Sequence, residues 1–102
     1  MAETIDEITI NWEDEEGNLA VKELKKEVLS RGAWTTIVFL LQNLDKKTGD
    51  YKAPQVRIVR YKKSNGRYLP QSKFTISSAR QARQITDILS GWLPEMGEAE
   101  SE

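Results

Sequence analysis

The longest apolar stretch of the chain, residues 34–44, predicts a strand that is buried on both faces. β-branched and aromatic residues dominate it, and it contains neither glycine nor proline, which is typical of a strand. Large apolar residues fall on both faces: Ile37, Phe39 and Leu41 on one, and Val38 and Leu40 on the other. A strand of this kind is covered on both faces. Because a single helix covers only one of them, we expect a second copy of the chain to cover the other.

Two turn signals follow this strand. Residues 45–49, DKKTG, predict a type I turn whose glycine takes a left-handed conformation and closes a hairpin with a bulge. Pro54 then stands at the start of the next strand, where its missing N–H is tolerated. Asn65-Gly66 is the strongest short hairpin signal, because both central residues of such a turn need positive φ. It predicts a hairpin between residues 55–63 and 67–76.

The Asn65-Gly66 turn also predicts the register of its hairpin, with Lys62 opposite Leu69 and Ile58 opposite Lys73. One face then carries the cations Arg60, Lys62, Arg67 and Lys73 among Val56, Ile58, Leu69, Gln71 and Thr75. The other carries the larger apolar residues, namely Val59, Tyr61, Tyr68, Phe74 and Ile76, with Arg57 and Lys63 at intervals. We expect the apolar face to meet a helix and the cationic face to bind a ligand. A register slip of one residue would exchange the two assignments.

Both ends of the chain are acidic. Residues 1–4 are expected to be disordered, and the alternation of Ile8, Ile10 and Trp12 with polar residues predicts a short strand. Residues 13–18 predict a solvated turn, whose carboxylates could alternatively imitate phosphates and cover a basic face. Residues 94–102 are expected to form an acidic disordered tail.

Two other segments complete the pattern. Residues 77–92 predict the C-terminal helix, which Ser77 or Ser78 caps and Gly91 and Pro94 end. Its apolar stripe is expected to pack on the sheet or on a second copy of itself and consists of Ala82, Ile85, Leu89 and Trp92, with Ile88 beside them. Residues 19–31 fit either a helix, capped by Asn18 and Gly32, or a strand that a turn at Arg31-Gly32 pairs with the apolar strand.

The net charge of −1 conceals a strong asymmetry. Seven acids and no base lie in residues 1–18, and four acids and no base lie in residues 95–102. All fifteen Lys and Arg residues lie between, with five acids, so this middle part carries +10, fifteen minus five. A basic body indicates polyanion binding, although lysine-rich surfaces also serve solubility and protect sheet edges.

Single-stranded nucleic acid, DNA or RNA, fits this pattern best. Such ligands bind basic grooves and stack their bases on aromatic rings, whereas the C-terminal helix, with only Arg80 and Arg83, is a poor recognition helix for duplex DNA. The candidate binding residues are Lys46, Lys47, Tyr51, Lys52, Arg60, Lys62, Arg67 and Lys73. Tyr51, in a polar turn, is the best stacking candidate, and Trp34 is expected in the core.

The chain lacks both histidine and cysteine. It therefore has no usual general base near neutral pH, no thiolate nucleophile and no Cys/His zinc site. We expect no enzymatic activity, no cofactor and no metal, with a hydrolase built from carboxylates alone as the formal exception. The absence of cysteine, of a signal-peptide pattern and of an 18-residue apolar run predicts a cytoplasmic protein without a membrane span.

Residues 44–54, LDKKTGDYKAP, and the step from Phe74-Thr75-Ile76-Ser77 into the helix resemble the positive cofactor four family. Members of that family are transcriptional coactivators of the whirly-like class that binds single-stranded DNA. The resemblance covers roughly residues 20–92. It implies a dimer, a curved antiparallel sheet and a DNA path over basic strands and turns. It also implies a strand at residues 20–30, which is why we favour a strand there.

These observations predict an α+β fold: an antiparallel sheet of about four to five strands followed by one C-terminal α-helix, assembled as a dimer. Residues 1–18 form the acidic N-terminal segment, residues 19–93 the domain, and residues 94–102 the tail. The predicted function is binding of single-stranded nucleic acid, DNA first, with low sequence specificity, as a transcription or DNA-maintenance cofactor. The alternative is a protein-interaction or assembly domain without a nucleic-acid role, which docks a partner through a strand edge or an apolar patch.

Overall fold

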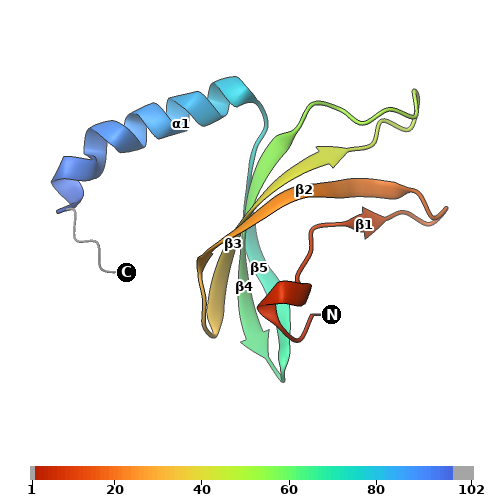
Figure 1. Cartoon of the computed structure of the whole chain (residues 1–102), viewed down its shortest axis with the longest axis horizontal. Helices are drawn as coiled ribbons and strands as arrows, with labels where there is room; N and C mark the ends of the chain where they lie inside the picture. The colour runs from red at the N-terminus through yellow and green to blue at the C-terminus, as the bar shows by residue number, and fades with distance from the viewer. Residues whose placement is uncertain (1, 98–102) are drawn as a thin grey trace.

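The chain forms a five-stranded antiparallel sheet followed by one helix, as seen in a computed structural model that describes residues 2–97 (Figure 1). The strands lie in chain order, so each pairs with its neighbours in sequence. The elements are the 3₁₀ turn η1 (Ile5–Glu7), β1 (Trp12–Glu13), β2 (Leu19–Ser30), β3 (Trp34–Asn43), β4 (Gln55–Ser64), β5 (Arg67–Ile76), α1 (Ala79–Trp92) and the 3₁₀ turn η2 (Leu93–Met96). The predicted fold class is confirmed, and the segment that fitted either helix or strand is the strand β2.

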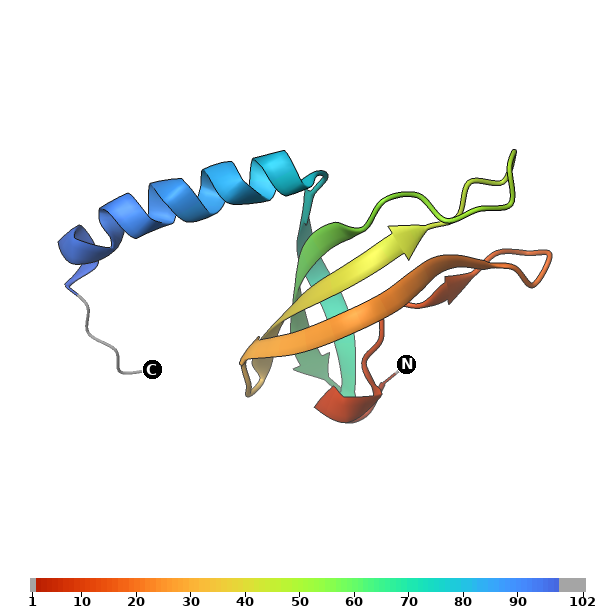
Figure 2. The same cartoon turned by 45° about the horizontal axis from the view of Figure 1, so that its top comes forward.

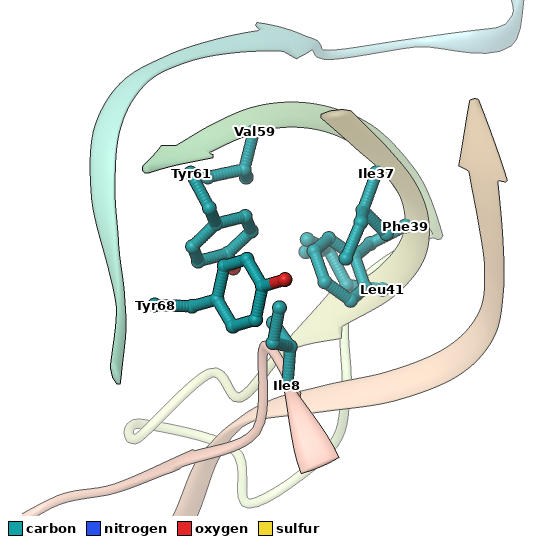
Figure 3. Close-up of a cluster of buried hydrophobic side chains, with 7 residues drawn as sticks. All are labelled: Ile8, Ile37, Phe39, Leu41, Val59, Tyr61 and Tyr68. Carbon is teal, nitrogen blue, oxygen red and sulfur yellow. The ribbon is translucent and has the colours of Figure 1, made fainter. Parts of the chain in front are cut away.

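The sheet curls around a core on its concave face (Figure 3). Seven buried side chains form this core: Ile8, Ile37, Phe39, Leu41, Val59, Tyr61 and Tyr68. Three of them come from alternate positions of β3, and these three are completely buried. The period of two in a strand places them on one side of the sheet, as the sequence predicted.

The N-terminal segment, residues 2–12, covers the concave face in place of the predicted helix. Ile8 inserts into the core, and the Lys26 ammonium donates hydrogen bonds of 2.7 Å to the carbonyl oxygens of both Ile5 and Ile8. Residues 2–4, which were expected to be disordered, have a defined place because Ala2 pairs with Tyr68. Residue 1 lies outside the described residues, as do residues 98–102 of the predicted tail.

The short N-terminal strand is smaller than its alternating pattern predicted, because side chains replace most of the backbone ladder. Only Trp12–Glu13 pairs as a strand, with β2. Before it, the Glu23 carboxylate accepts hydrogen bonds from the Thr9 hydroxyl (2.7 Å) and from the Ile10 backbone N–H (3.3 Å). The Asn11 side-chain oxygen in turn accepts one from the Glu23 backbone N–H (2.7 Å). Residues 9–11 therefore run along β2 and are held to it by side-chain hydrogen bonds rather than by backbone pairing.

A bulge in β5 corrects the predicted register of the last hairpin. Lys62 lies opposite Leu69 as predicted, but Val59 rather than Ile58 lies opposite Lys73. The shift falls between Arg60 and Tyr61, beside Pro70, which cannot donate to a ladder and is tolerated at such irregularities. Residues 72–76 therefore exchange faces relative to the prediction, and Lys73 lies on the concave face.

The helix α1 leaves the sheet after β5 and projects away from it in both views (Figures 1 and 2). Ser78 caps its start as predicted, with its hydroxyl accepting a hydrogen bond from the backbone N–H of Gln81 (3.1 Å). The helix ends at Trp92, the last residue of the predicted range, and η2 then ends at Gly97, whose φ is 85°. Pro94 lies within η2, at a position where its missing N–H is not needed. Neither α1 nor any other helix among residues 2–97 is long and apolar enough to cross a lipid bilayer.

Replacing Phe39 with alanine is expected to lower the free energy of unfolding by about 3–5 kcal/mol, because the ring is completely buried and its loss leaves a cavity. The matched control is Phe74→Ala, since Phe74 is 55% exposed on the convex face. Urea denaturation followed by circular dichroism measures both. Equal losses for the two variants would contradict a core confined to the concave face.

Candidate nucleic-acid interface

An aromatic ring with two cations close to it lies at one end of the convex face. Trp34 begins β3, opposite Lys62 of β4, and Arg60 is one pair further along the same face. The Arg60 guanidinium carbon lies 4.4 Å from the centre of the indole ring, and the Lys62 ammonium nitrogen lies 5.2 Å from it. The indole is 43% exposed, so the expectation that Trp34 belongs to the core is wrong. We call Trp34, Arg60 and Lys62 the basic patch.

Arg67 extends the basic patch around the Asn65-Gly66 turn. It lies opposite Ser64 at the tip of the hairpin, on the same face as Lys62 and Leu69. Asn65 has a φ of 53° and Gly66 a φ of 81°, so both central residues take the positive φ that the predicted turn requires. The tight turn thereby keeps Arg67 close to the end of β4.

The three lysines of the 45–54 loop lie at the other end of the sheet. This loop connects the far ends of β3 and β4 and projects from the sheet (Figure 2). Lys46, Lys47 and Lys52 are exposed, and the Lys52 carbonyl accepts a hydrogen bond from the Gln42 amide (3.1 Å). The candidate residues therefore form two groups at opposite ends of β3 and β4, rather than one cluster.

Tyr51 joins the 45–54 loop to the start of β2. Its hydroxyl donates a hydrogen bond to the Leu19 carbonyl (2.8 Å), its backbone bridges to Leu44, and the Lys22 ammonium lies 5.1 Å from the ring centre. The half-buried ring lines a small hollow with Lys46 and Gly49. Tyr51, which was expected to be the best stacking candidate, is thus half-buried and tied to β2 by its hydroxyl. Trp34 has the more exposed aromatic side chain.

Lys73 lies across the sheet from the basic patch, beside an open cleft of about 880 Å³ on the concave side. The N-terminal segment forms one wall of the cleft, and Tyr61, Tyr68 and Arg57 line the sheet side. The Arg57 side chain donates a hydrogen bond to the Thr75 hydroxyl (3.0 Å). Burial, with a smaller contribution from the Glu23 carboxylate, raises the pKa of Tyr61 to about 12, so its phenol is neutral at pH 7.

One carboxylate of the acidic turn reaches a candidate residue. An oxygen of Asp14 lies 3.6 Å from the Lys46 ammonium. The other oxygen accepts hydrogen bonds from the backbone N–H groups of Glu16 and Asn18, each 2.9 Å. These bonds, that from Asn18 foremost, hold the pKa of the Asp14 carboxyl below its ordinary value of 3.8. Asp14 therefore organises its own turn, and its contact with Lys46 is the one place where the acidic segment meets a candidate cation within residues 2–97.

Residues 2–97 contain no cluster of three or more His, Cys, Asp or Glu side chains that could hold a metal ion. Comparison with known protein families, with curated proteins and with solved structures finds no match for this chain.

Replacing Asp14 with asparagine is expected to destabilise the fold at pH 7, and the difference from the parent chain should shrink as the pH falls below 3.8. The folded-state pKa is lowered, so ionised Asp14 favours folding above that value and loses its contribution as the pH falls through the folded-state pKa. Thermal unfolding at pH 7 and pH 3 measures the effect. Glu15→Gln, which removes an exposed carboxylate from the same turn, is the control and should change stability little at either pH.

Proposed function

We propose that this chain is a binding module for single-stranded nucleic acid, DNA in the first place, with low sequence specificity. The observation that carries the proposal is the exposed Trp34, whose indole lies close to the cations of both Arg60 and Lys62. Unpaired bases stack on exposed aromatic rings, and neighbouring cations neutralise the phosphates that link the bases. The basic patch offers both kinds of contact within a few ångströms of one ring.

The charges around the basic patch support an anionic ligand. Within residues 2–97, the one ion pair with an N–O distance of 4.0 Å or less joins Lys46 to Asp14. No carboxylate of residues 2–97 therefore forms an ion pair with Arg60, Lys62 or Arg67. Cations without a counter-ion on an exposed sheet surface attract phosphates at long range and at contact. The proposed binding is therefore dominated by phosphate contacts, which carry no base identity and account for the low specificity.

We further propose a non-enzymatic, cytoplasmic role as a transcription or DNA-maintenance cofactor. The resemblance of residues 44–54 to the positive cofactor four family supports the cofactor role. The lack of histidine and cysteine in the sequence supports a role in binding rather than in catalysis and a reducing compartment.

The second candidate function is a protein-interaction module, and the position of β5 favours it. β5 is an edge strand of the sheet, and Ala2 pairs with it only near Tyr68. An extended peptide of a partner protein could add to such an edge through backbone hydrogen bonds. That mode needs neither Arg60 nor Lys62, so charge reversal in the basic patch separates the two functions.

The double variant Arg60→Glu/Lys62→Glu is expected to abolish binding of a fluorescent single-stranded DNA oligonucleotide in an anisotropy titration at low salt. The control is Lys63→Glu/Lys73→Glu, which makes the same change in charge on the concave face of β4 and β5 and should retain most of the affinity. For the parent chain, the affinity should fall as salt rises, with a slope of about −0.7 per neutralised phosphate. Loss of binding only in the control variant would place the ligand on the concave face. No binding by the parent chain at low salt would overturn the proposal.

Replacing Trp34 with alanine is expected to weaken binding of single strands by roughly 5- to 150-fold, the equivalent of about 1–3 kcal/mol for one stacked base. Trp34→Phe keeps an aromatic face and should restore part of the affinity. Duplex DNA, whose bases are already stacked, should bind more weakly and respond little to either change. An equal response of single-stranded and duplex DNA would show that the indole supplies no stacking contact.

A further inference from the structure

The open cleft of about 880 Å³ on the concave side has the size and the lining of a small-molecule site. Most of the lining is apolar, and part of it is the core itself. The apolar lining includes Ile8, Ile10 and Trp12 of the N-terminal segment and Val59, Tyr61 and Tyr68 of the sheet. Ligand sites in proteins have volumes of about 300–1,000 Å³ and apolar walls, with a few polar groups that orient the ligand. We call this space the concave cleft.

Trp12 shows that the concave cleft leaves apolar surface in water. Its side chain lines the cleft, and yet the residue is 59% exposed. Covering such a surface with an apolar ligand is favourable, because apolar groups are removed from water on both sides. The apolar lining therefore favours a ligand with an apolar body.

Two cations lie on the sheet side of the concave cleft, towards the start of β4. Arg57 and Lys73 both line the cleft. They are diagonal neighbours on one face of the sheet, because Arg57 lies opposite Thr75 and Lys73 lies opposite Val59. Neither cation forms an ion pair with a carboxylate of residues 2–97. Both charges are therefore available to an anionic ligand.

The Arg57 guanidinium is held in place for such a ligand. Its Nε–H donates a hydrogen bond to the Thr75 hydroxyl (3.0 Å), and the side chain is half-buried. The terminal nitrogens carry further N–H donors, which can bind both oxygens of one carboxylate. These hydrogen bonds are stronger in a partly buried site than in water. Arg57 thus offers a fixed contact for a carboxylate.

One carboxylate, that of Glu7, lines the opposite wall of the concave cleft. The exposed Glu7 side chain accepts a hydrogen bond from the Glu3 backbone N–H (3.0 Å), which stabilises its charge within the N-terminal segment. Together with Arg57 and Lys73, it leaves the lining with a charge of +1, two minus one. The charge of the cleft therefore still favours an anion.

This arrangement suits a ligand with one anionic end rather than a polyanion. A nucleic acid needs cations along the whole path of its backbone. The concave cleft offers two cations on one side, and the rest of its sheet side is apolar where Val59, Tyr61 and Tyr68 lie (Figure 3). Phosphates bound beyond Arg57 and Lys73 would have no cation of the lining beside them.

We propose that the concave cleft binds a small carboxylate with an apolar body, of the class of medium-chain fatty acids. The carboxylate lies on Arg57 and Lys73, and the apolar chain lies along Val59, Tyr61 and Tyr68. This inference goes beyond the proposed binding of nucleic acid and does not depend on it, because the basic patch lies on the opposite face of the sheet.

Isothermal titration calorimetry with sodium decanoate, at concentrations below those at which it forms micelles, tests the proposal. Decanoate should bind saturably at one site, and octanoate should bind about fourfold more weakly for each methylene that it lacks. Decyltrimethylammonium, which has the same chain and a positive head, should bind far more weakly than decanoate. Equal binding of the two decyl compounds, or no saturable binding of decanoate, would overturn the proposal.

The variant Lys73→Glu should weaken decanoate binding by about tenfold or more, because a repelling charge replaces a charge-assisted hydrogen bond. Lys73 is exposed, so the fold should persist, and circular dichroism checks this. The matched control is Lys25→Glu, which makes the same change in charge at an exposed position of β2 that does not line the cleft. Equal losses in the two variants would show that decanoate responds only to the net charge of the chain, which contradicts a site at Lys73.

The position of the ligand is checked by nuclear magnetic resonance. Decanoate should shift the backbone amide signals of Arg57, Val59 and Tyr61, and shifts confined to the outer face of the sheet would overturn the site. The proposed nucleic-acid function fails separately, because its test is an oligonucleotide titration of the Arg60→Glu/Lys62→Glu variant. Decanoate binding by a chain that binds no oligonucleotide would therefore support the cleft and overturn only the other proposal.

Discussion

The strand β3 is apolar on both faces, and this constraint determines what must surround it. Its odd-numbered residues, Ile37, Phe39 and Leu41, are completely buried on the concave face, whereas Val38 and Leu40 are only half-buried on the convex face. Apolar surface left in water costs about 25 cal/mol for each Å². The chain covers the concave face with its own N-terminal segment, and the second copy expected from the sequence would cover the convex face.

Lys26 holds the N-terminal segment on the concave face of the sheet. Lys26 faces the concave side of β2, opposite Phe39, where a charged side chain would ordinarily be costly. Its ammonium donates to the carbonyls of Ile5 and Ile8 at 2.7 Å and reaches that of Asp6 at 3.4 Å. The turn η1 presents these carbonyls together, so Lys26 has partners and the N-terminal segment is tied to the sheet. An apolar residue at this position would pack well but leave those carbonyls without their donor.

Local patterns predicted the elements of this fold well, because the relevant physics acts between near neighbours. The β-branched and aromatic composition of β3, the Asn65-Gly66 turn and the Ser78 cap all depend on a few adjacent residues. The N-terminal cover was missed because it depends on Lys26, about twenty residues away, and on side chains that replace backbone pairing. The apolar stripe of the helix was expected to pack on the sheet or on a second copy of itself, because such a stripe predicts burial but not the surface that provides it. The sheet of the same chain leaves Leu89 and Trp92 exposed.

The candidate site was predicted in part. Arg60, Lys62 and Arg67 share a face because the register near the turn is set by the turn itself. Lys73 was misplaced, since the bulge beside Pro70 shifts every later residue of β5 by one position. Trp34 was wrongly expected in the core, although the sequence indicates its position. It lies at an even-numbered position of β3, like Thr36 and Val38, and these positions face the convex side. In a strand that is apolar on both faces, the face on which an aromatic residue lies follows from whether its number is odd or even, and not from the size of its side chain.

The bulge also separates the positive charges of the hairpin. In an unbroken ladder, Lys73 would lie on the convex face opposite Ile58, among the apolar side chains of that face. With the bulge, Phe74 takes that place. The convex face of β3, β4 and β5 therefore remains apolar between the basic patch and the end of β5 from which α1 starts.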